Sequence, residues 1–214
     1  MEANQVETRT LITSLAIIVS IELAMRLVLP KHALDSMVVL GVARTLQVGL
    51  IILCLVTWGQ GVSCIGLAPS KIVAGFKKGL IWSAGFGILV LFAFAVLYMA
   101  GINMLALIHA RLPKEPSTIA LFFLIGGIVG PIAEEVFFRG ILYGFLRRWG
   151  VLVALTFSTL LFVLAHSISH GVFIPQVVGG ILFAIAYEVE GSLLVPITIH
   201  TLGNLAIFTL SLMS

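Results

Sequence analysis

Two adjacent carboxylates, Glu134 and Glu135, lie in a segment that is otherwise almost entirely apolar, and Arg139 follows them. In a helix, Glu135 and Arg139 share one face and can pair, whereas Glu134 is rotated by about 100°. We therefore expect Arg139 to hold Glu135 ionised while Glu134 remains free to titrate. Two carboxylates in different environments can divide the acid and base roles of a reaction. The alternative is that both glutamates only anchor Arg139 in a buried network.

Later apolar segments supply polar residues that could act with these carboxylates. His166 and His170 have the spacing of a two-histidine metal site, but the glutamate of a His-Glu-x-x-His motif is missing. His170 precedes Gly171, so we expect it at a helix end, and His166 is the better functional candidate. His200 and Asn204 are also four residues apart and share a face, where they could serve catalysis or form an interhelical hydrogen-bond clip.

The amino-acid composition indicates whether the chain resides in water or in a membrane. Of the 214 residues, 60% are hydrophobic and 10% are charged, whereas soluble domains carry about 25% charged residues. The net charge of +3 is spread over segment ends and does not indicate nucleic-acid binding. Cys54 and Cys64 have no ligand-type spacing. The sequence predicts an integral, multi-pass membrane protein in contact with the lipid bilayer.

We expect an all-α, polytopic transmembrane helical bundle of about seven spans within a single domain, residues 1–214. Residues 61–78 should form a loop leading into a short basic interfacial piece, and residues 109–117 a polar linker. Counted inward at about 1.5 Å per residue, the four candidate polar residues fall within one membrane layer. The predicted spans are 10–29, 36–57, 79–101, 118–146, 151–168, 172–188 and 192–213.

Further features of these segments have structural interpretations. Pro131 should kink the fourth span next to Glu134, and its glycines at 126, 130, 140 and 144 should permit close helix packing. Glu22 and Arg26 are expected to pair, while Arg44 and Gln47 help to pack the second span. Because Lys and Arg favour the cytoplasmic side, their distribution of six against three places the N-terminus in the cytoplasm.

The ordered motifs Glu134-Glu135-x-x-x-Arg139, Phe162-x-x-x-His166 and His200-x-x-x-Asn204 resemble those of the CAAX-processing and bacteriocin-processing intramembrane proteases, which include the type II CAAX prenyl endopeptidases. The resemblance covers residues 118–204, and residues 1–117 contribute N-terminal helices and linkers outside it.

The resemblance implies hydrolysis of a peptide bond inside the membrane. Glu134 with His166 would activate a water molecule, His200 and Asn204 would stabilise the oxyanion, and Glu135 and Arg139 would order the site. The substrate would be a membrane-anchored protein or peptide: a prenylated protein, a bacteriocin-like precursor or a C-terminal sorting tail. A bacterial-type plasma membrane is the expected location.

Metal dependence stays open. Glu134, His166 and His200 could form a three-ligand zinc site with one open position. If zinc took Glu134, however, the base would have to be Glu135, which pairs with Arg139. We therefore favour a mechanism without a cofactor.

Two other functions compete with proteolysis. A non-catalytic immunity or scaffold protein could retain the fold, although all motif residues are present here. A proton-coupled transporter would also use intramembrane Glu and His, but no inverted repeat with paired broken helices is visible.

Overall fold

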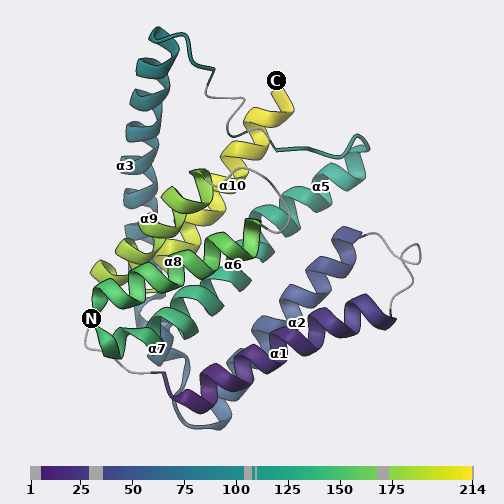
Figure 1. The fold of residues 1–214 in the computed structure, drawn as a ribbon, viewed down its shortest axis with the longest axis vertical. Helices are drawn as coiled ribbons and strands as arrows, with labels where there is room; N and C mark the ends of the chain where they lie inside the picture. The colour runs from purple at the N-terminus through teal and green to yellow at the C-terminus, as the bar shows by residue number, and fades with distance from the viewer. Residues whose placement is uncertain (1–5, 29–35, 104–107, 109, 168–173, 214) are drawn as a thin grey trace.

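The computed structural model describes residues 6–28, 36–103, 108, 110–167 and 174–213, and among these it contains helices and no strand (Figure 1). The helices before the carboxylate segment are α1 (Thr8–Val28), α2 (Ser36–Thr57) and α3 (Ile72–Met99). After it come α8 (Val151–Ser167), α9 (Ile174–Glu190) and α10 (Leu194–Met213). The carboxylate segment itself is helical from Pro116 to Leu146 and is built from α5 (Pro116–Leu124), η3 (Ile125–Val129), α6 (Gly130–Glu135), η4 (Val136–Tyr143) and α7 (Gly144–Leu146).

The predicted polytopic helical bundle is confirmed. Each of the seven predicted spans coincides with one of these helical stretches, and in the described residues five stretches are long and apolar enough to cross a membrane. Leu89, Leu91 and Phe92 on α3 illustrate the outward-facing apolar side chains, with exposed fractions of 61%, 71% and 67%. Such surfaces are suited to lipid rather than to water.

The prediction for residues 61–78 was wrong in its second half. Short 3₁₀ turns occupy Val62–Ile65 and Pro69–Lys71, and α3 then begins at Ile72, so the basic residues Lys77 and Lys78 belong to its first turns. Gly79 lies inside this helix, and its lack of a side chain lets α10 pack closely against α3. A Cβ on Gly79 would lie 2.6 Å from the Thr198 Cβ on α10. The linker prediction also ran slightly too far, since α5 begins at Pro116, a residue favoured in a first helical turn.

α1 and α2 form a hairpin that lies beside the carboxylate helix (Figure 1). The expected pair of Glu22 with Arg26 was wrong. Glu22 Oε1 instead accepts a hydrogen bond from Arg44 Nη1 at 2.6 Å and another from Gln47 Nε2 at 3.1 Å. Two facing helices bring these groups together, and such a contact cannot be deduced from spacing within one helix.

The other helices form the remainder of the bundle. α10 packs along α3 and α9, and α8 packs against α9 and η4. Their shared core contains the aromatic residues Phe138, Phe162 and Phe183. The glycines of the carboxylate helix permit close contacts, but not all of these are with another helix: a Cβ on Gly126 would lie 3.4 Å from the Phe208 ring on α10, whereas one on Gly140 would lie 3.2 Å from the Ile65 Cβ in η1 and one on Gly144 2.9 Å from the Val6 Cγ2.

Candidate active site

The helix that carries both glutamates is irregular on either side of them. π-helical turns occupy Ile125–Val129 and Val136–Tyr143, and only the six residues Gly130–Glu135 between them are α-helical. Pro131 lies in the first turn of that short piece, so the distortion expected at the proline is present as a π-helical turn just before it. π-bulges are frequent at functional sites because they redirect side chains locally.

Glu135 and Arg139 form the expected pair. Arg139 Nη1 donates to Glu135 Oε1 at 3.1 Å, and both side chains are fully buried. The guanidinium also donates through Nη2 to the Gly180 carbonyl oxygen at 3.1 Å. Its carbon lies 4.5 Å from the Phe162 ring centroid and 5.3 Å from that of Phe183. Carboxylate, carbonyl and ring faces together compensate the loss of water around this cation.

Two residues on α9 that contact the Arg139 guanidinium, Gly180 and Phe183, were not identified as site residues from the sequence. A Cβ on Gly180 would lie 2.8 Å from the Thr159 Cγ2 on α8, so only glycine lets the two helices approach this closely. The Gly-Gly pair within an otherwise apolar helix was the available signal. Phe183 gives no such signal, because an aromatic residue in an apolar helix is ordinarily a core residue.

His200 is buried and held on two sides. Its Nδ1 lies 2.8 Å from Glu135 Oε1, and its ring stacks on Phe183 with centroids 4.6 Å apart and planes at 22°. Because a carboxylate paired with arginine is an acceptor, Nδ1 carries the proton that it donates. Nε2, on the other side of the ring, therefore faces a second partner.

His166 is also held through Nδ1, but by a backbone carbonyl oxygen instead of a carboxylate. Its Nδ1 lies 2.8 Å from the Phe162 carbonyl oxygen, which can only accept, so Nδ1 is again the protonated nitrogen. Nε2 then faces Glu134, 3.4 Å from Oε2. The side chains of His166 and Glu134 are 31% and 24% exposed, unlike those of the fully buried Glu135 and Arg139.

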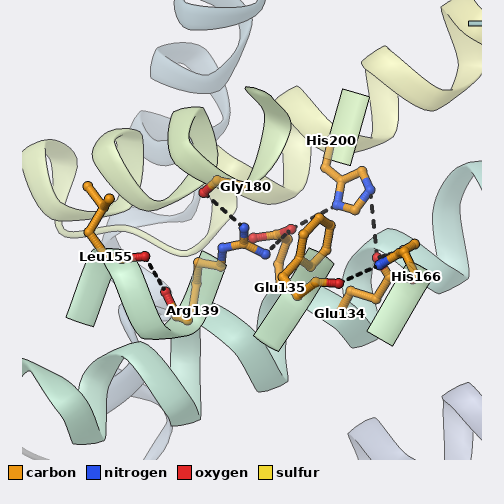
Figure 2. A network of polar contacts seen from close by, with 9 residues as sticks. Glu134, Glu135, Arg139, Leu155, His166, Gly180 and His200 are labelled. Atoms are coloured by element: carbon orange, nitrogen blue, oxygen red, sulfur yellow. Dashed lines mark hydrogen bonds and ion pairs between the residues drawn. The ribbon is translucent and has the colours of Figure 1, made fainter. Parts of the chain in front are cut away.

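Glu134 is the point at which both imidazoles meet (Figure 2). His200 Nε2 lies 3.8 Å from the same Oε2 atom that faces His166, and this oxygen is buried without a hydrogen-bond partner among the described residues. The shared membrane depth predicted for Glu134, His166 and His200 thus corresponds to direct proximity. Oε2 and the two Nε2 atoms converge here, and a shared proton or a bridging water molecule would give this oxygen a hydrogen-bond partner.

Asn204 lies on the same helix as His200 and contacts the carboxylate helix at another level. Its Nδ2 donates to the carbonyl oxygen of Gly126 at 3.0 Å, and Gly126 belongs to the π-helical turn Ile125–Val129. An amide nitrogen carries two hydrogens, so one remains for another acceptor. Among the described residues, no recorded hydrogen bond or ion pair joins the Asn204 side chain to the side chains of Glu134, His166 or His200. The remaining candidate, His170, lies outside the described residues.

The donor set has the chemistry of a zinc site, since both histidines would be neutral and tied through Nδ1 to an outer partner. Within the described ranges, no group of three or more His, Cys, Asp or Glu side chains is placed to hold a metal ion. No step below is therefore derived through a metal.

Comparison with known proteins agrees with the motifs. Residues 116–206 match the model of the family described as type II CAAX prenyl endopeptidase Rce1-like. The chain is also 38% identical over 94 residues to the membrane-embedded CAAX protease MroQ of Staphylococcus aureus. The aligned segment covers 40% of this chain and 37% of that protein. No solved structure matches the chain. The resemblance inferred from the motifs is confirmed over this segment, and the chain is a multi-pass membrane protein.

Proposed function

We propose that this chain is an intramembrane endopeptidase that hydrolyses a peptide bond of a membrane-associated protein or peptide. The convergence of two imidazole Nε2 atoms on Oε2 of Glu134 carries this proposal. The match to the CAAX protease family over the segment that contains these residues supports it. The alternative role as an anchor for Arg139 fits Glu134 poorly, because the recorded partner of Arg139 is Glu135.

Glu134 is the proposed general base. A water molecule next to Oε2 would lose a proton to the carboxylate as its oxygen forms a bond to the scissile carbonyl carbon. His166 Nε2 would accept the second hydrogen of that water and so orient it. The proton held on Glu134 would then pass to the leaving amine as the carbon–nitrogen bond breaks. Both side chains are partly exposed, although Oε2 itself is buried, so the reacting water would have to enter between the two imidazoles and this oxygen.

His200 and Asn204 are the proposed oxyanion donors. Because His200 Nδ1 donates to Glu135, Nε2 can donate only when the ring is an imidazolium. The buried Glu135 carboxylate stabilises that cation, which gives the Arg139–Glu135 pair a role in ordering the site. The second amide hydrogen of Asn204 completes the pair of donors. Removal of one oxyanion donor typically costs about 2.7–4 kcal/mol in the barrier.

The proposed reaction needs no metal, and the proposed setting is a bacterial-type plasma membrane with the N-terminus in the cytoplasm. Lys71, Lys77, Lys78, Arg147 and Arg148 lie near the ends of helices that this orientation places on the cytoplasmic side. The substrate is a membrane-anchored protein or peptide.

The test compares the termini of membrane proteins in cells that carry the wild-type chain and in cells that carry Glu134→Gln. We expect a small set of new termini only with the wild type. Glu190→Gln is a matched control, because this carboxylate bonds to Lys78 and Trp82 at the end of α9, away from the site. Equal termini in wild-type and Glu134→Gln cells, at equal protein levels, would contradict the proposed function.

A further inference from the structure

Phe183, on α9, contacts two groups of the candidate active site, although the chemistry proposed above gives it no part. Its ring lies against the His200 imidazole, with centroids 4.6 Å apart and planes at 22°. The Arg139 guanidinium carbon lies 5.3 Å from the same ring centroid. The side chain is 8% exposed, so it lies within the bundle rather than at the lipid surface. One buried ring thus touches a proposed oxyanion donor and the buried cation beside it.

The hydrogen bonds of His200 do not by themselves fix the plane of its ring. Nδ1 lies 2.8 Å from Glu135 Oε1, whereas Nε2 lies 3.8 Å from Glu134 Oε2, which is longer than a hydrogen bond. The last torsion of a histidine side chain has a broad distribution, so an imidazole held at one nitrogen can still turn about that contact. Such a turn would move Nε2 away from the reacting atoms. Another contact must therefore hold the plane of the ring.

The stack with Phe183 supplies that contact. A near-parallel ring blocks rotation of the imidazole out of its plane, because the two faces would collide. The other phenylalanine beside His200 is Phe162, which meets the imidazole edge-on, at 76° with centroids 5.9 Å apart. The phenylalanines of this core also meet one another edge-on, Phe138 and Phe162 at 89° and Phe162 and Phe183 at 83°. The near-parallel stack thus distinguishes the Phe183–His200 contact from the ordinary packing of this core.

Two glycines that precede Phe183 on α9 make room for its ring. A Cβ on Gly179 would lie 3.2 Å from the Cε2 and Cζ atoms of Phe183, so the ring lies back along the helix over this glycine, in the direction that helical side chains favour. Gly180 lets α9 approach Thr159 on α8, and its carbonyl oxygen accepts the hydrogen bond from Arg139. The same turn of α9 therefore binds Arg139 and places Phe183 against the imidazole.

The orientation of an oxyanion donor affects the rate of reaction more than the binding of substrate. Such a donor must lie about 2.7–3.1 Å from the position that the oxyanion will occupy, and a displacement of about 1 Å can cost on the order of 10²-fold in rate. The substrate carbonyl of the ground state does not yet carry the charge that the donor stabilises. A change that only misaligns His200 should therefore lower kcat and leave KM unchanged.

We propose that Phe183 is a positioning residue that holds the His200 imidazole in the plane from which Nε2 reaches the oxyanion. This inference rests on the proposed endopeptidase function and adds to it a residue outside the three motifs. A role in packing alone has a different consequence, since it would lower stability without affecting catalysis more than the loss of another buried aromatic residue on α9.

The experiment uses the full chain in phosphatidylcholine proteoliposomes and one mixture of N-palmitoylated, quenched-fluorescent peptides with randomised sequence. The variants are Phe183→Leu and Phe183→Met, which remove the ring and keep an apolar side chain. Tyr187→Leu is the matched control, because Tyr187 is fully buried one turn further along α9 and its recorded ring contact is with Tyr143. Apparent kcat and KM are measured for each variant, together with thermal unfolding in detergent.

We expect both Phe183 variants to lower kcat by about tenfold, the larger effect of one stacked aromatic pair, with KM unchanged. Tyr187→Leu should keep the wild-type kcat although its unfolding temperature falls. A wild-type kcat in the Phe183 variants, a loss confined to KM, or an equal loss of kcat in Tyr187→Leu would overturn the inference. If Phe183→Leu does not fold, Phe183→Met decides by the same criteria. Failure of both to fold, under conditions in which Tyr187→Leu folds, would make Phe183 a structural residue and also overturn it.

An NMR measurement tests the position of the imidazole without cleavage. The proton that His200 Nδ1 donates to the buried Glu135 carboxylate should give a downfield signal in protein with isotope-labelled histidine, identified by its absence in His200→Gln. The signal should persist in Tyr187→Leu and broaden in Phe183→Met, and an unchanged signal in Phe183→Met would overturn the inference. Glu134→Gln must abolish cleavage of the peptide mixture. Cleavage that persists in this variant would contradict the proposed function itself, and the NMR comparison of His200 does not depend on that result.

Discussion

Replacing Glu135 by glutamine should damage the protein more deeply than the same replacement of Glu134. Oε1 of Glu135 accepts hydrogen bonds from Arg139 at 3.1 Å and from His200 at 2.8 Å, and the carboxylate is fully buried. Glutamine is nearly isosteric but uncharged, so it leaves the buried Arg139 cation without its counter-charge. Removing one partner of a buried pair typically costs about 3–5 kcal/mol. We therefore expect a clear loss of thermal stability together with a loss of activity.

Glu134→Gln should have the reverse balance. This side chain is 24% exposed, and its contacts are with two imidazoles rather than with a fully buried cation. Loss of its charge removes the proposed base but leaves the Glu135–Arg139 pair in place. The protein should insert and unfold at nearly the wild-type temperature, with no measurable cleavage.

The assay is thermal unfolding of both purified variants in the same detergent, followed by cleavage of one peptide mixture in proteoliposomes. A third variant, Glu135→Gln with Arg139→Met, removes both charges and should recover part of the stability lost by Glu135→Gln, without recovering activity. The assignment of roles would be refuted if Glu135→Gln were as stable and active as the wild type while Glu134→Gln failed to fold.

Three further predictions test other parts of the site. Asn204→Ala should lower kcat by about 10²–10³ with little change in KM, and an unchanged kcat in steady-state kinetics would remove Asn204 from the oxyanion site. Enzyme stripped with a strong chelator should retain most of its activity, and a full loss that stoichiometric zinc restores would show that a metal is required. Gly180→Ala should lower the unfolding temperature because its Cβ would lie 2.8 Å from the Thr159 Cγ2, whereas Gly85→Ala, with no neighbour within 4 Å, should not.

The sequence predicted the fold well because lipid restricts what a chain can do. A membrane span requires about 20 apolar residues, so the helices could be marked off from hydropathy alone. The ends were predicted less well. α3 begins at Ile72 and continues through Gly75 and Gly79, both of which are buried, although the basic residues suggested an interfacial segment.

The contacts of the site were predicted where they lie within one helix and missed where they join two. The Glu135–Arg139 pair follows from a spacing of four residues, and it is present. Arg44 opposite Glu22, and Gly180 opposite Arg139, depend on which helices face each other and on how closely they approach. Spacing along the chain contains neither quantity. The contact of Arg44 with Glu22 was therefore not foreseen, and Arg44 had been interpreted as a packing residue of the second span.

Charge balance connects the separate parts of the site. Arg139 and Glu135 cancel each other, which leaves Glu134 as one negative charge between two imidazoles whose outer nitrogens are already committed. An uncompensated charge is costly in an apolar medium, so the charge of Glu134 depends on the two imidazoles that face it. The rate of cleavage as a function of pH should accordingly change when either histidine is replaced, even if the remaining residues keep their positions.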